Sequence, residues 1–153
     1  MTKKNYDIIA RQREDIMKAY RKIAPTCHSQ QEAWEKLVKS PAPRYYVSAR
    51  RAWDKLRRMV VGDFSVADNM KPIRRRMYYS LYNKLMEMSQ RKEYMGQSLW
   101  FICQFLVTEP APEFFCTPAS IRDIFHKYKR YGRDYRESEL RRQKKLAKKA
   151  AAK

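Results

Sequence analysis

A short proline-rich segment occurs twice in this chain, and the repeat restricts the possible folds more than any other sequence feature. Residues 40–48 read Ser-Pro-Ala-Pro-Arg-Tyr-Tyr-Val-Ser, and residues 109–117 read Glu-Pro-Ala-Pro-Glu-Phe-Phe-Cys-Thr. They align without a gap at an offset of 69 residues, the separation of Pro41 and Pro110. The prolines exclude a helix and predict an extended segment whose paired aromatic residues pack in the core, with stacking on unpaired bases as the alternative. We interpret the repeat as an internal duplication, with chance similarity of two turns as the alternative.

Apolar residues at helical spacing flank both proline-rich segments, and Ser29, Ser48 and Thr117 are suitable N-caps. The pattern predicts helices over about residues 5–24, 29–39, 48–61, 72–89, 97–107 and from Thr117 onward. The 97–107 segment is apolar nearly all round, so we expect it to be the most buried helix. A short strand is its alternative.

The predicted fold class is all-α, with two tandem three-helix units similar to helix-turn-helix domains and a basic C-terminal arm. Residues 1–61 form the first unit, 62–70 a linker, 71–131 the second unit and 132–153 the tail. Only three glycines occur, fewer than sheets with tight turns normally need. From Arg133 onward the tail has nine basic and three acidic residues, which predicts a solvated helix or a disordered arm that orders on a polyanion.

The charge of the chain is strongly positive. Lysine and arginine number 35 against 16 acidic residues, which gives a formal net charge of +19. Solubility alone needs a net charge of only about 2–8, so a polyanionic partner is expected. Nucleic acid, an anionic membrane surface and an acidic protein are the candidates.

The last helix of each predicted unit is rich in arginine and lysine, as in helix-turn-helix domains whose final helix enters the major groove. Arg44, Arg50 and Arg51 lie near the start of one such helix, from which they could reach base edges or phosphates. The preceding loop has about eight residues, whereas a standard helix-turn-helix has about three to four. The predicted nucleic-acid-binding residues are Arg44, Arg50, Arg51, Lys55, Arg57, Arg58, Arg74, Arg75, Arg76, Arg122, Lys127, Lys129, Arg130, Arg141, Arg142, Lys144, Lys145, Lys148 and Lys149.

Two further groups of charged residues have expected roles. Arg74, Arg75 and Arg76 begin the 72–89 helix, where cations oppose the helix dipole, which favours an external anion there. Asp54 and Asp123 are aligned in the repeat, and we expect both to pair with nearby arginines.

Motifs for catalysis or metal binding are missing from the sequence. It has no glycine-rich phosphate loop, no HExxH and no paired acidic motif, so we predict no enzyme activity, no cofactor and no metal. Cys27 and His28 are adjacent and cannot form a dyad by themselves. Together with Cys103, Cys116 and His126 they have none of the usual zinc spacings. The odd number of cysteines favours a reducing compartment.

No signal peptide is apparent, and the longest apolar run, residues 99–107, is far too short to cross a bilayer. We therefore expect a soluble cytoplasmic protein with no membrane partner.

The 40–48 segment, the Ser98-Leu99-Trp100 run and residues 110–115 together resemble small basic uncharacterised proteins of Bacteroidota genomes, their phages and mobile elements. The resemblance covers about residues 11–130. It implies a cytoplasmic protein of a bacterial cell, with a phage-encoded or virion-associated protein as the alternatives, and it brings no activity or site residues with it.

These features predict a nucleic-acid-binding protein of a phage or mobile element that acts in regulation, packaging or recombination, with double-stranded DNA favoured over RNA. The alternative is a structural protein whose basic surface docks onto an acidic protein or RNA in a large assembly such as a virion or ribosome. A large exposed apolar patch on the Leu99–Val107 helix would indicate a protein partner or a homodimer there.

Overall fold

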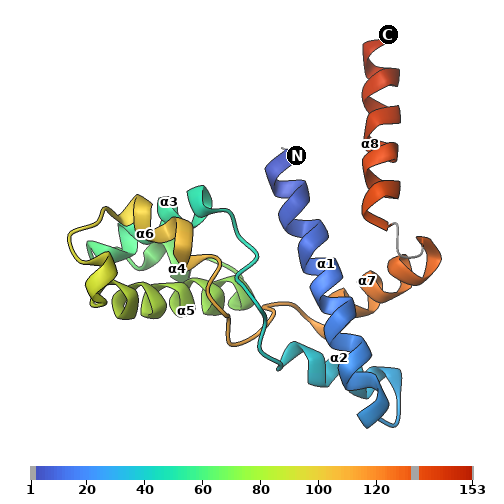
Figure 1. Cartoon of the computed structure of the whole chain (residues 1–153), viewed down its shortest axis with the longest axis horizontal. Coiled ribbons are helices and arrows are strands. Elements are labelled where there is room, and N and C mark those ends of the chain that lie inside the picture. The colour runs from blue at the N-terminus through green and yellow to red at the C-terminus, as the bar shows by residue number, and fades with distance from the viewer. Residues whose placement is uncertain (1–2, 132–134, 153) are drawn as a thin grey trace.

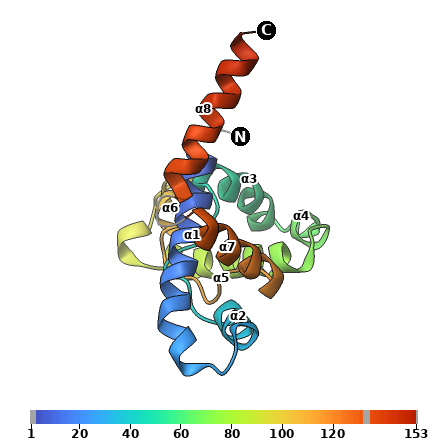
Figure 2. The ribbon, with the colours of Figure 1, turned by 90° about the vertical axis from the view of Figure 1, so that its right-hand side faces the viewer.

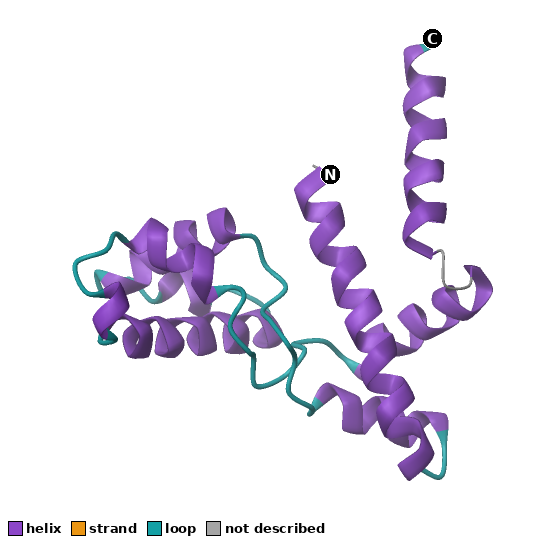
Figure 3. Ribbon diagram, in the orientation of Figure 1, coloured by secondary structure: helices purple, strands orange, loops and turns teal. Residues whose placement is uncertain are grey.

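The computed structural model describes residues 3–131 and 135–152, and its regular elements are helices (Figure 3). In order, the α-helices of these described residues are α1 (Lys3–Ile23), α2 (Gln30–Val38), α3 (Ala49–Val60), α4 (Ser65–Asp68), α5 (Pro72–Ser89), α6 (Leu99–Leu106), α7 (Pro118–Tyr131) and α8 (Tyr135–Ala151). Short 3-10 turns at Ala24–Thr26 and Lys92–Tyr94 follow α1 and α5. The all-α prediction is confirmed, and the segment with helix and strand as alternatives forms a helix, α6.

Four helix starts show that the repeat extends beyond the proline-rich segments. The hydroxyls of Ser29, Ser48, Ser98 and Thr117 each accept a hydrogen bond from the amide three residues later, at 3.1–3.2 Å. Ser98 lies 69 residues after Ser29, and Thr117 lies 69 residues after Ser48. Residues 3–60 and 72–129 are therefore two copies of one helical arrangement, hereafter the first and second copy.

The two proline-rich segments meet each other at equivalent positions. Ala42 and Ala111 form an isolated antiparallel bridge, in which each amide donates to the other residue's carbonyl oxygen at 3.0 and 2.9 Å. The aromatic residues that follow also pair reciprocally, with Tyr45 stacked on Phe115 and Tyr46 on Phe114. Reciprocal contacts between equivalent positions are those of a twofold-symmetric interface. The two copies are thus related by an approximate twofold axis between the segments.

The helices form two bundles on either side of this crossing (Figure 1). α7 of the second copy packs against α1 and α2, and these three helices are the first bundle. α3 of the first copy packs against α5 and α6, with α4 beside them, and these four are the second bundle. The last helix of each copy has therefore been exchanged between the bundles.

The tandem arrangement of two sequence-consecutive three-helix units is not confirmed. Pro41 and Pro43 keep the chain extended after α2, and this extended segment leads α3 to α5 and α6 and away from α2. Tyr45 and Phe114, each only 2% exposed, instead join the bundles into one continuous core.

Residues 62–70, predicted as a linker, contain α4 and pack against the second bundle. Ala67 is fully buried, and the ring of Phe64 stacks on Tyr79 and meets Tyr82 edge-on. This segment therefore adds to the core and does more than connect the two copies.

The helix α8 extends away from both bundles (Figure 2). The side chains of residues 141–152 are exposed, including the apolar Leu146. Of the two alternatives for the tail, the structure has the helix, over residues 135–151, and its side chains from residue 141 onward are solvated. The predicted tail residues 132–134 and 153 lie outside the described residues.

Candidate nucleic-acid interface

Two arginines from separate predicted clusters line one pocket beside the crossing. The pocket has a volume of about 220 Å³, and Arg51 of α3 and Arg74 of α5 lie on its wall. Tyr46, Phe114 and Phe115 of the crossing segments provide aromatic walls. The structure thus brings together the head of the α3 arginine cluster and the head of the α5 cluster.

Local sequence explains why both arginines lie at the pocket. Ser48 caps α3, which places Arg51 in its first turn, and Pro72 occupies the favoured first position of α5, which places Arg74 in its first turn. The free amides of a helix N-terminus add positive potential to that of the side chains. Two helix starts and two guanidinium groups therefore favour an anion at one place.

Among the side chains of residues 8–130 and 141–152, no carboxylate forms an ion pair with Arg51 or Arg74. The positive charges of the two guanidinium groups lie near the phenol of Tyr78, which is fully buried. Burial raises the pKa of Tyr78, and the nearby Arg74 and Arg51 oppose that rise. An anion from outside the chain would supply the missing counter-charge.

The outer surface of α3 extends this basic region. Arg50 and Arg57 lie over the ring of Trp53, with guanidinium-to-centroid distances of 5.3 and 5.0 Å. Arg57 also pairs with Asp54 at 3.2 Å, which confirms the expected role of that carboxylate. Arg58 is exposed. The predicted residue Lys55 also lies on α3 and is half-buried.

The three consecutive arginines of α5 have different surroundings. Arg75 donates to the backbone oxygen of Met70 at 3.2 Å, and Arg76 pairs with Glu113 of the other proline-rich segment at 2.8 Å. Arg74 lines the pocket. One of the three is thus oriented for an external anion, while another holds α5 to the crossing.

Arg44 differs from the other predicted contacts because it is half-buried in its own segment. Its Nε–H donates to the backbone oxygen of Tyr45 at 3.0 Å, and it lines a pocket of about 160 Å³ with Arg11 and Asp15. Burial lowers the pKa of Arg44, and the positive charge of Arg11 lowers it further. This arginine contributes to the crossing as well as to the surface charge.

The remaining predicted contacts lie on the first bundle and on α8. Arg122 pairs with Asp123 at 3.8 Å, as expected for that aspartate. Lys127, Lys129 and Arg130 are exposed along α7. The tail residues of the prediction are exposed along α8: Arg141, Arg142, Lys144, Lys145, Lys148 and Lys149. The second bundle and the first bundle with α8 therefore carry separate basic surfaces.

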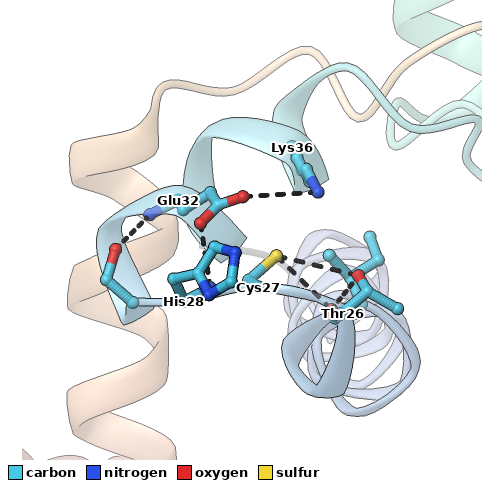
Figure 4. A network of polar contacts seen from close by, with 7 residues as sticks. Thr26, Cys27, His28, Glu32 and Lys36 are labelled. Carbon is cyan, nitrogen blue, oxygen red and sulfur yellow. Dashed lines mark hydrogen bonds and ion pairs between the residues drawn. The ribbon is translucent and has the colours of Figure 1, made fainter.

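Cys27 and His28 belong to the turn between α1 and α2 (Figure 4). The Cys27 thiol donates to the backbone oxygen of Ile23 at 3.4 Å, and the Thr26 hydroxyl donates to the same oxygen at 2.7 Å. The amide of His28 donates to a carboxylate oxygen of Glu32 at 2.9 Å. These contacts connect the end of one helix to the start of the next.

The other cysteines lie in apolar surroundings. Burial raises the pKa of both Cys103 and Cys116 to about 12, and the charge of Glu113 adds to the rise at Cys116. Among residues 3–131 and 135–152, no group of three histidine, cysteine or acidic side chains lies close enough to hold a metal ion. None of the described helices has the length and apolarity to span a membrane.

The α6 helix was expected to be the most buried one, and this prediction is wrong for its outer side. Ile102, Cys103 and Leu106 face the core, whereas three large aromatic residues face solvent. Trp100, Phe101 and Phe105 are 41%, 37% and 45% exposed. The repeat in the sequence indicates that this side of α6 is exposed, because Trp100, Phe101 and Phe105 all align with polar residues of α2.

Comparisons with protein-family models, with curated proteins and with solved structures found no match to this chain.

Proposed function

We propose that this protein binds nucleic acid, with duplex DNA as the preferred form, and that the pocket beside the crossing holds a backbone phosphate. The convergence of Arg51 and Arg74 at two helix starts, without a carboxylate partner in the described part of the chain, is the observation that carries the proposal. Helix starts and arginine guanidinium groups are both established phosphate ligands.

In this proposal α3 is the helix that approaches the DNA groove. Its core-facing residues are Ala52, Leu56 and Met59, and its exposed side carries Arg50 and Arg58. A helix-turn-helix domain positions such a helix with its sequence neighbour. Here α5 and α6 of the other copy would take that role, since they are the helices packed against α3.

The approximate twofold axis predicts a second helix in contact with DNA. α7 is the counterpart of α3 in the first bundle and carries exposed Lys127 and Lys129. Dimeric DNA-binding proteins use two symmetry-related helices to contact two half-sites in opposite orientation. A single chain with an internal twofold axis could contact two half-sites in the same way. The half-sites would differ, because Arg50 and Arg51 align with Ala119 and Ser120.

The biological setting follows as part of the same proposal. A net charge of +19 and the resemblance of the proline-rich segments to small basic proteins of Bacteroidota genomes, phages and mobile elements favour a genome-handling role in the bacterial cytoplasm. Regulation, packaging and recombination are the processes in which such a DNA-binding protein would act.

Titration of labelled duplex DNA at several salt concentrations tests the proposal. Replacing Arg51 and Arg74 by alanine should weaken binding roughly tenfold at about 0.1 M salt and reduce the slope of log affinity against log salt by about 1–2. The matched control replaces Arg76 and Arg122 by alanine. It removes the same charge from arginines that already pair with Glu113 and Asp123.

The control should weaken binding by no more than about twofold, since those guanidinium groups have carboxylate partners. Equal loss in both double variants would show that binding follows net charge and not the pocket. Failure of the unmodified protein to bind DNA at about 0.1 M salt would reject the function itself. Duplex RNA should bind more weakly than DNA, because its deep, narrow major groove does not admit a helix.

A further inference from the structure

The outer side of α6 carries exposed aromatic rings that form two groups of contacts. Phe105 contacts Tyr94 and Phe101 at centroid distances of 6.0 and 5.2 Å, and Trp100 meets Trp53 of α3 edge-on at 5.9 Å. We call Trp53, Trp100, Phe101 and Phe105 the aromatic face. Monomeric proteins rarely expose such groups together without a binding role.

The equivalent surface of the first bundle is polar at every matching position. α2 and α6 have the same serine cap and the same core-facing leucine, Leu37 in one and Leu106 in the other. Their outer sides differ: Trp100, Phe101 and Phe105 align with Gln31, Glu32 and Lys36. The flanking α3 residues Trp53, Val60 and Val61 align with Arg122, Lys129 and Arg130 of α7.

The polar outer side of α2 shows that the packing of the bundle does not depend on aromatic residues at these positions. The first bundle keeps the same helix pairing with polar residues at these positions, where Glu32 and Lys36 pair at 3.4 Å. The fold therefore does not require aromatic side chains on the outer side of α6. A surface that is apolar in only one of two equivalent places serves a partner.

The charges at its edge indicate what that partner carries. Arg50 and Arg57 lie over Trp53, and Arg57 already pairs with Asp54 at 3.2 Å, so Arg50 is the guanidinium that an incoming carboxylate would meet beside the aromatic rings. Carboxylates beside apolar side chains would complement this surface. A second copy of this chain would bring the same arginines together on proteins of net charge +19, which opposes self-association.

The geometry of the rings also favours protein over unpaired bases. Trp53 and Trp100 meet at an interplanar angle of 84°, and Phe101 and Phe105 at 54°. Bases bind to exposed parallel ring faces, which this arrangement does not offer in series. Exposed Val60 and Val61 nearby provide aliphatic surface with no stacking capacity. Aromatic, aliphatic and arginine side chains in combination are typical of protein–protein contacts.

From these observations we infer that the aromatic face binds an acidic amphipathic helix of another protein, with the apolar side of that helix on Trp100, Phe101 and Phe105 and its carboxylates toward Arg50. This mode of recognition is a helix packed into an apolar groove or face. The rings that carry this inference lie on α6, whereas the proposed function assigns DNA binding to the pocket arginines and the exposed side of α3; Arg50 lies at the edge of both surfaces.

The test uses the full chain and two labelled peptides of about five helical turns with equal negative charge. One has leucine and phenylalanine along one side, and the other has glutamine at those positions. At about 0.15 M salt the apolar peptide should bind at least roughly tenfold more tightly than the polar one. This difference should disappear in the variant Trp100→Gln, Phe101→Glu, Phe105→Lys, which gives α6 the outer side of α2 without changing net charge.

The matched control is Leu146→Gln on α8, an exposed apolar residue away from the face, which should leave peptide binding unchanged. Circular dichroism establishes that the triple variant is folded, and Phe105→Lys alone replaces it if it is not. Duplex-DNA affinity should stay within about twofold in the triple variant, which separates this inference from the proposed function. Equal binding of both peptides, or unchanged preference in the variant, overturns the inference. Two further results would also overturn the inference. One is self-association of the protein that the triple substitution abolishes, and the other is a roughly tenfold loss of oligothymidylate binding in the triple variant.

Discussion

The helices α2 and α6 occupy equivalent places in the two bundles, yet their outer sides have opposite character. Both begin at a serine cap, and both direct a leucine into the core. The outer side of α2 carries Glu32 and Lys36, whereas the corresponding positions of α6 carry Phe101 and Phe105. The difference distinguishes the residues that stabilise the fold from those that would bind a partner. Caps and buried residues are shared by both copies, and the exposed residues are free to diverge.

The crossing is where the two copies should respond most similarly and most strongly. Tyr45 and Phe114 are equivalent and almost completely buried, so replacing either by alanine should destabilise the protein by about 3–5 kcal/mol. Chemical denaturation of both variants measures the loss. Tyr45→Phe should cost only about 1 kcal/mol, since it removes a hydrogen bond of 2.7 Å with Ser80. A loss below about 1 kcal/mol in one alanine variant alone would break the proposed equivalence of the copies.

The helix caps should give an intermediate effect that is again equal in the two copies. Replacing Ser48 or Thr117 by alanine removes one hydrogen bond to the first turn of α3 or α7, and each change should cost about 1 kcal/mol. Ser48→Thr and Thr117→Ser preserve the acceptor and serve as controls. Thermal or chemical unfolding checks both pairs, and a clear difference between Ser48→Ala and Thr117→Ala would show that the bundles are stabilised differently.

Exchanging the outer residues should affect stability least. The triple variant that gives α6 the outer side of α2 should unfold within about 0.5 kcal/mol of the original protein, because all three side chains are partly exposed. Denaturant midpoints provide the comparison. A larger loss would mean that the aromatic rings support the second bundle, and this would weaken the argument that they serve a partner.

A small pH effect should distinguish the two copies. The amide of His28 and the ammonium of Lys36 hold the pKa of Glu32 below its ordinary value of 4.5. A carboxyl whose pKa is lower in the folded state stabilises the fold above its ordinary pKa, and this contribution is lost as the pH falls through the lowered value. Glu32→Gln should therefore reduce stability slightly at neutral pH and not at pH values below that range. Substituting Phe101, the equivalent residue of α6, should produce no such pH dependence.

Much of the local structure could be predicted from individual residues. Ser29, Ser48 and Thr117 have the hydroxyl that an N-cap requires, and each caps a helix in the structure. Asp54 and Asp123 pair with arginines of their own helices, as short sequence separation suggested. These features depend on groups three or fewer residues apart, so the sequence contains all the information needed.

The arrangement of the candidate site could not be predicted in this way. Arg51 and Arg74 were assigned to separate clusters, and their meeting at one pocket depends on α3 packing against α5. The exposed side of α6 does not follow from its sequence, because an apolar side chain alone does not indicate which of two helix faces is buried. Aligning Trp100 and Phe105 with Gln31 and Lys36 would have revealed the exposed face.

The sequence by itself determined the helices, their caps, the extended proline-rich segments and the excess of positive charge, since each follows from local propensity or composition. The tertiary structure decided which helices pack together. Two copies joined by similar proline-rich segments can in principle close each onto itself or exchange their last helices. The reciprocal bridge between Ala42 and Ala111 and the burial of Tyr45 and Phe114 favour the exchange. These are contacts between residues about 69 positions apart, and their energy depends on the three-dimensional fit and not on either segment alone.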